Sequence, residues 1–313
     1  MSELCKCGDG LSNLGVPSCK EGFDVAKRLI FVEQLDNDGN QNAIDVADVL
    51  DSTYLDGKFY NADKSQRWFI TPDFDNVTDE RADTETQTLD SGIELPLRQG
   101  QRTFTAFFQT LPASWGRKIG ANACAKVGVY IVDTVGNIIG SESKDGTKLT
   151  PVKIASGTFN AVFVKKSNDS VQGWNITFTY DNTELDAYLK VISSDVIGED
   201  LTSTNGIIDV TLAETSGTPA TTTTLSVDAT LECYGNFGDR DPFVAGELAD
   251  FTLFNVTQSA AVVPSGVTQD PDGTYLITFP AQLSADVIRV SLTAPDVTGK
   301  GFEGANTVDV TIP

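Results

Sequence analysis

Apolar residues recur at every second position along much of the chain, in short runs separated by turn residues. This period of two predicts β-strands, because successive side chains on a strand point to opposite faces of a sheet. Four pairs of runs are spaced as hairpins, at residues 93–108, 126–142, 160–180 and 207–233. The pattern therefore predicts a mainly β protein in which neighbouring strands pair in sequence.

Three segments are predicted to be helical instead, because apolar residues recur there at intervals of three and four or because the residues favour a helix. They are residues 42–54, with a stripe of Ile44, Ala47, Leu50 and Tyr54, residues 111–124, and residues 182–192. Each segment is short. We expect one to three short helices that flank the sheets.

The pattern of apolar and turn residues changes near residue 240. From there on, short strands follow one another closely, with Gly, Pro and Asp turns between them and no helical pattern, which is typical of a small β-sandwich. Residues 1–22 are rich in Gly, Ser, Asn and Cys and show no period. The sequence thus predicts an extended arm at 1–22, a β domain at 23–239 and a sandwich at 240–313.

The chain is strongly acidic, with 44 Asp and Glu against 22 Lys and Arg and a net charge of -22. Such a charge repels nucleic acid and anionic membranes, so neither is expected as a specific partner. Of the regions 1–110, 111–175, 176–234 and 235–313, the second is the one in which bases outnumber acids. A basic region in an acidic chain favours electrostatic pairing between copies of the protein.

Catalytic chemistry has little support, because the chain contains no histidine. This excludes Ser-His-Asp and Cys-His mechanisms within one chain and removes the commonest zinc ligand. Hydrolysis by paired carboxylates stays open, although no distinctive local pair marks it. We therefore expect a protein that is not an enzyme and needs no cofactor.

The amino-terminal cysteines Cys5, Cys7 and Cys19 have a spacing that could indicate zinc, but any fourth cysteine lies far along the chain. A packed or extended arm is the better interpretation. The first residues form no apolar leader, and no run reaches the length of a membrane span. These features predict synthesis in a cytoplasm, with reduced cysteines.

Three runs carry a resemblance to a known family: "RWFITPDFDNVTDERADTETQTLDSG", "IELPLRQGQRTFTAFF" and "KVGVYIVDTVGNIIG". Over roughly residues 20–235 the sequence resembles virion structural proteins of tailed phages, particularly tail tube proteins with a C-terminal immunoglobulin-like domain. The resemblance implies β-sandwich or barrel subunits that form hexameric rings, which stack into a tube that conducts DNA. It also implies a place in the virion tail, with other virion proteins as partners, and no catalytic residues.

The acidic stretch at residues 73–90 has a possible role in such a tube. Polar residues alternate with threonines there, as on a strand that is wetted on both faces. Asp79, Glu80, Asp83 and Glu85 are the candidates for a lumen lining, because an acidic lining repels phosphate and lets DNA slide without binding. A solvated acidic loop is the open alternative.

Other functions fit the same features. A head fibre, a capsid decoration protein or a tail-terminator protein would also be acidic and rich in strands. A carbohydrate-binding adhesin could use Trp68, Trp115 or Trp174, but these lie in apolar runs or near a candidate helix, so core packing is the better interpretation.

Overall fold

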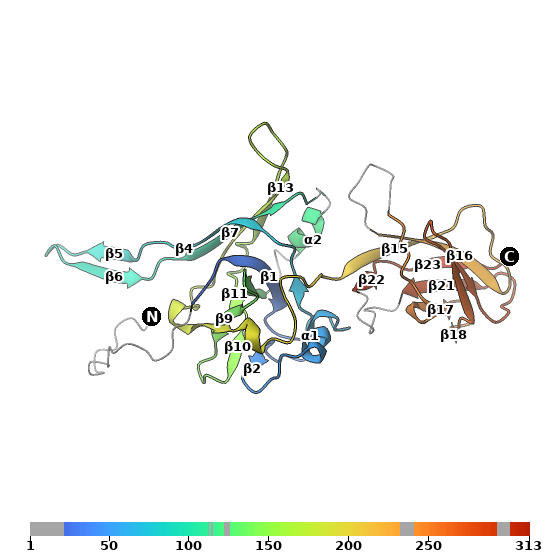
Figure 1. Ribbon diagram of the computed structural model, residues 1–313, viewed down its shortest axis with the longest axis horizontal. Helices are drawn as coiled ribbons and strands as arrows, with labels where there is room; N and C mark the ends of the chain where they lie inside the picture. Colours follow the sequence, from blue (N-terminus) through green and yellow to red (C-terminus); the bar gives the residue numbers. More distant parts are fainter. Residues whose placement is uncertain (1–21, 112, 114, 122–125, 232–240, 293–300) are drawn as a thin grey trace. The chain divides into compact units, whose positions relative to one another are not determined.

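The computed structural model describes residues 22–111, 113, 115–121, 126–231, 241–292 and 301–313 (Figure 1). Strands dominate these residues, which confirms the predicted mainly β fold with short helices. The α-helices of the described part are α1 (Ser52–Phe59) and α2 (Trp115–Ala121), and the 3₁₀ turns are η2 (Asp186–Tyr188), η3 (Ser194–Val196) and η4 (Leu248–Asp250). In the described ranges, every helix is too short or too polar to cross a lipid bilayer.

The chain divides into two units. The first comprises residues 1–52 and 70–204, and the second comprises residues 53–69 and 205–313. The cysteine arm predicted at 1–22 lies almost wholly outside the described residues, as do Cys124 and Cys233.

An eight-stranded sheet forms one layer of the first unit, with the order β2-β10-β9-β8-β1-β3 and with β11 and β14 paired to β8 and β9. β1 and β8 pair along their full length, and all of β8 is buried, because both of its faces are covered. The strands are β1 (Ala26–Glu33), β2 (Ile44–Asp45), β3 (Phe69–Ile70), β8 (Val127–Asp133), β9 (Ile138–Glu142), β10 (Lys148–Thr150), β11 (Val152–Lys153) and β14 (Leu189–Ile192).

A four-stranded antiparallel sheet forms the second layer, in the order β12-β13-β7-β4. Its strands are β4 (Asp75–Arg81), β7 (Arg102–Gln109), β12 (Asn160–Val164) and β13 (Gly173–Thr179). Phe104, Phe108 and Phe178 from this sheet pack with Phe31 and Ile131 from the first in one buried core. The aromatic rings of Phe104 and Phe178 stack with their centroids 5.1 Å apart.

A separate two-stranded hairpin, β5 (Glu85–Thr88) and β6 (Glu94–Arg98), continues the β4–β7 ribbon. Figure 1 shows it extending away from the other strands of the first unit. The predicted hairpin at 93–108 is wrong, because β6 pairs with β5 while β7 pairs with β4 and β13. The other three predicted hairpins are confirmed by β8–β9, β12–β13 and β15–β16.

The second unit is a two-sheet sandwich over a single described core. One sheet has the order β19-β20-β16-β15-β22 and the other β18-β17-β21-β23. β15 and β22 are parallel, and the other described strand pairs of this unit are antiparallel. The strands are β15 (Ile208–Glu214), β16 (Thr224–Leu231), β17 (Phe251–Asn255), β18 (Ala260–Val262), β19 (Gly266–Gln269), β20 (Thr274–Thr278), β21 (Val287–Leu292), β22 (Phe302–Gly304) and β23 (Val308–Thr311).

The two units divide at 204–205, and not near residue 240, where the sequence pattern predicts the domain boundary. The difference has a direct cause: β15 and β16 precede residue 240, yet they pair with β22 and β20. Alternation within each strand could not show this, because it identifies strands but not their partners. Residues 53–69 join the same unit through the buried Arg67, whose Nη1 donates to Glu303 Oε2 at 2.8 Å.

The structure differs from two of the predicted helices: the first starts later in the chain, and the other is replaced by a 3₁₀ turn and a strand. Ile44 lies in β2, and the helix begins only at Ser52, because Asp48 and Asp45 side chains bond the backbone of residues 45 and 47 in a turn. The 182–192 segment forms η2 and then β14, which pairs with β9. The short helix within 111–124 is confirmed as α2.

The three tryptophans pack in apolar surroundings, which confirms their interpretation as core residues. Trp68 and Trp174 are buried. The Trp115 ring lies 4.9 Å from the Phe108 ring, between centroids. These side chains are therefore not an exposed platform for a sugar.

Candidate functional site

The β5–β6 hairpin is an exposed ribbon with one apolar face. Every residue from Ala82 to Arg98 is exposed. Ile93 and Leu95 alternate along the β6 side, so they share a face, and Leu97 lies next to them where the pairing with β5 shifts register; the three are 56%, 44% and 56% exposed. A lone two-stranded hairpin is marginal in water, and an uncovered apolar face is a feature of interaction surfaces.

Ion pairs fix the base of this hairpin. Arg81 and Arg102 lie directly opposite each other on β4 and β7, where like charges would repel. Asp79 accepts two hydrogen bonds from Arg102, at 2.6 and 2.8 Å. Asp186 accepts from both arginines, at 2.8–2.9 Å, and thereby links the hairpin base to η2.

These pairs also shift the pKa values of the groups involved. Hydrogen bonds from Arg81, and the charges of Arg81 and Arg102, lower the pKa of Asp186 in spite of partial burial. Burial lowers the pKa of Arg102, but the hydrogen bonds and charge of Asp79 outweigh it and leave that pKa above its ordinary value. Both groups therefore stay charged near neutral pH.

Gly100 allows the two strands to meet at this base. A Cβ atom at that position would lie 1.9 Å from the carbonyl oxygen of Ala82, which is far inside van der Waals contact. Arg81 Nη1 also donates to the Gly100 carbonyl at 2.8 Å. Gln99 and Gly100, which lie between the two runs of the hairpin predicted at 93–108, thus stand at the base of a long ribbon and not in a tight turn.

The four-stranded sheet has one face on the core and one polar face turned away from it. Cross-strand neighbours on this polar face include Thr105 and Thr177, whose hydroxyls lie 3.2 Å apart. Asp75 and Glu80 are the charged residues of this face within the four strands, and none of its residues there is Lys or Arg. Its side chains are Asp75, Thr78, Glu80, Thr103, Thr105, Phe107, Gln109, Asn160, Val162, Val164, Asn175, Thr177 and Thr179.

Both edges of the same sheet are open. Among the described strands, β12 pairs only with β13, and β4 pairs only with β7. Unpaired edges present a row of free backbone donors and acceptors, and native proteins normally cover them. The sheet can therefore be extended at either edge by another strand.

The structure separates the four acidic residues proposed for the lumen. Glu80 lies on the polar face, and Asp79, its neighbour on β4, points the other way toward Arg102. Asp83 and Glu85 are exposed on the hairpin, where Glu85 forms an ion pair with Arg98 at 2.7 Å. The four residues do not form a single cluster.

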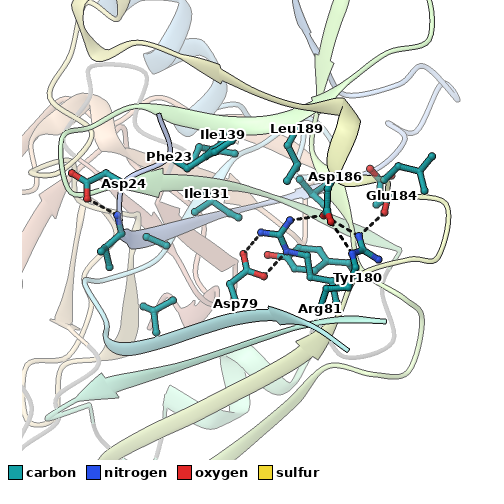
Figure 2. A pocket seen from close by; sticks show the side chains of 16 residues that line it. Phe23, Asp24, Asp79, Arg81, Ile131, Ile139, Tyr180, Glu184, Asp186 and Leu189 are labelled. Carbon is teal, nitrogen blue, oxygen red and sulfur yellow. Dashed lines mark hydrogen bonds and ion pairs between the residues drawn. The ribbon is translucent and has the colours of Figure 1, made fainter. Parts of the chain in front are cut away.

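A cavity of about 460 Å³ lies between the two sheets at the hairpin base. Figure 2 shows Asp79, Arg81, Tyr180 and Asp186 gathered along one side of it. Burial and the charge of Asp79 raise the pKa of the Tyr180 hydroxyl well above its ordinary value, so it stays protonated. The described residues contain no group of Cys, Asp or Glu side chains placed to bind a metal ion.

Sequence reasoning missed Arg81, Arg102, Tyr180 and Asp186. Asp186 lies 105 residues from Arg81 and 84 from Arg102 in the chain. No local spacing in the sequence could reveal such a contact. Two arginines opposite each other on paired strands do indicate that carboxylates lie nearby, because the two positive charges would otherwise repel. In comparisons with known proteins, no protein-family model and no curated protein matches the sequence.

The hairpin base is expected to weaken in acid. Because its pKa is lowered on folding, Asp186 contributes stability above its unfolded pKa of about 4 and loses that contribution as the pH falls further. Asp186→Asn should therefore lower the thermal midpoint by about 1–2 °C at pH 7, and the difference should vanish in acid. Calorimetric scans across pH measure this, with the exposed Asp195→Asn as control. An equal difference at all pH values would contradict the ionic role.

Proposed function

We propose that the protein is a structural subunit of a tailed-phage virion that self-assembles into stacked rings forming a tail tube. The rings would be hexameric, as in the tail tube proteins that the sequence resembles. The observation that carries the proposal is the β5–β6 hairpin, whose apolar face no other described strand covers. A second copy is the fitting cover, because every copy has the same exposed ribbon and the same open sheet edges.

The open edges of the four-stranded sheet support ring closure. Pairing of β4 in one copy with β12 in the next would satisfy both edges and make a continuous sheet around a ring. The same contact would repeat head to tail around the ring, and burial of each hairpin against another copy would be needed in addition to hold the copies together.

The polar face of that sheet supports a lumen for DNA. Affinity for DNA grows with each phosphate that Lys or Arg neutralises, and this face has neither residue within the four strands. Its threonines and asparagines would be wetted, and Asp75 and Glu80 would repel phosphate. DNA could then pass without specific binding.

Assembly should depend on the apolar face of the hairpin. The triple variant Ile93→Ser, Leu95→Ser, Leu97→Ser removes side chains that are exposed in the single chain, so folding should be retained. Burial of these side chains against another copy would be lost, and the protein should sediment as a monomer where the wild type forms large assemblies.

The matched control changes three exposed apolar residues of the second unit, Phe254, Leu276 and Leu283, to serine. Sedimentation velocity with this control should show assemblies like those of the wild type. Unaltered assembly of the hairpin variant would refute the role of the hairpin, and a monomeric wild type at every concentration would refute self-assembly itself.

A further inference from the structure

The four-stranded sheet of the first unit has a different hairpin at each end of its strands. Beyond Arg81 and Arg102 the β4–β7 ribbon continues into the β5–β6 hairpin. At the other end of β7, Gln109 pairs with Gly173 of β13, and the turn at 165–172 joins β12 to β13. β7 has 8 residues, so the two ends lie about 25 Å apart at about 3.3 Å per residue.

The β5–β6 end is acidic and partly apolar. Residues 82–98 contain four Asp and Glu residues against one arginine, a net charge of -3. The arginine is paired with Glu85, whereas Asp83, Asp90 and Glu94 are exposed and have no ion pair among the described residues. Together with its exposed apolar side chains, the hairpin therefore offers an apolar contact area within a field of negative charge.

The turn at 165–172 is basic. It contains Lys165 and Lys166 against one carboxylate, Asp169. Both lysines are exposed, and neither forms an ion pair with another residue of the described ranges. Val171 in the same turn is 49% exposed, so this end also offers an apolar side chain next to its charges.

α2 adds to the positive charge of this end. Gly116 in α2 lies against the ring of Trp174, which follows the turn directly at the start of β13. α2 contains two basic residues and no acidic residue. The turn and α2 together have four basic residues against one acidic residue, a net charge of +3, in a chain whose net charge is -22.

We propose that the β5–β6 hairpin of one copy binds the basic end of another copy, which is formed by the turn at 165–172 and α2. The two ends of one copy cannot neutralise each other, because about 25 Å is well beyond the screening length of about 8 Å at physiological salt. Their opposite charges are therefore free to act on another copy. This inference rests on the proposed self-assembly and names the two surfaces that meet.

Apolar burial and charge would have different roles in this contact. Burial of Ile93 and Leu95 against the partner would stabilise it, since exposed ion pairs contribute only about 0–1 kcal/mol each. The charges would select the end that the hairpin binds, because two acidic hairpins repel each other. Two different surfaces meet at every such contact, so the contact can repeat from copy to copy, as a stack requires.

Reversal of charge at one end tests the contact by sedimentation velocity of the full chain. Lys165→Glu with Lys166→Glu should raise the protein concentration needed for large assemblies about tenfold, because several attractive pairs become repulsive. Asp90→Lys with Glu94→Lys should do the same from the other side. The four changes in one chain make the two ends opposite in charge again, so they should restore assembly.

The control is Lys144→Glu with Lys148→Glu, which makes the same change of net charge at exposed residues beside β9 and β10. It should assemble at the wild-type concentration. Equal weakening by this control, or no recovery in the fourfold variant, would overturn the contact. Unchanged assembly of both single-end variants would overturn the contact and leave self-assembly standing, whereas a wild type that never assembles would refute both.

Discussion

Removing residues 240–313 should expose the remaining strands of the second unit and make the chain aggregate. β15 and β16 would remain, but they would lose β22 and β20. Val210, Leu212, Leu225 and Val227, all at most 2% exposed, would then face water. At about 2 kcal/mol for each side chain, this loss is comparable to the whole stability of a typical domain, about 5–15 kcal/mol.

The truncation would also leave Arg67 without Glu303, the carboxylate that pairs with its buried guanidinium. Soluble yield and the cooperativity of thermal unfolding measure the outcome. Two substitutions at neighbouring residues of β20 test whether loss of the buried core causes the unfolding. Ile277→Asp, at a buried position, should unfold the second unit, and Leu276→Asp, at an exposed position, should not. A truncated chain that stays soluble and keeps β15 and β16 folded would contradict the division at residues 204–205.

Lysines on the polar face of the four-stranded sheet should turn the assembled protein into one that retains DNA. Thr78→Lys, Asn160→Lys and Asn175→Lys change three exposed residues of this face. If the face lines a lumen, each lysine can neutralise a phosphate, and the logarithmic salt slope should steepen by about 0.9 for each contact made. Filter binding of a short duplex at several salt concentrations measures this slope.

A control with the same change of charge places three lysines on the second unit, at Thr252, Thr268 and Thr278, which are exposed there. Its assemblies should retain as little DNA as the wild type. Equal retention by both variants would show that only net charge matters. Asp79→Lys is not informative, because it would break the ion pair with Arg102.

The sequence predicts strands well where both partners are local. The β8–β9 and β12–β13 hairpins follow from alternation and turn residues alone. It fails where a distant partner decides the structure: residues 189–192 have a helical pattern, yet β9 offers an edge to which they pair as β14. Helix propensity is weak enough for such pairing to override it.

The candidate site was predicted only in part. The alternating polar stretch correctly indicated a strand that is wetted on both faces, and β5 is exposed throughout. The stretch could not show that Asp79 and Glu80 point to opposite sides, because that depends on which face of β4 meets the core. The ion pairs of Asp186 depend on chain folding over more than eighty residues and leave no local signal.

Electron microscopy of the purified full chain at high concentration tests the central claim most directly. If the chain is a tail tube subunit, the images should show hollow rings, or tubes made of stacked rings, with a stain-filled central channel. Monomers alone at every concentration, or solid assemblies without a channel, would contradict it.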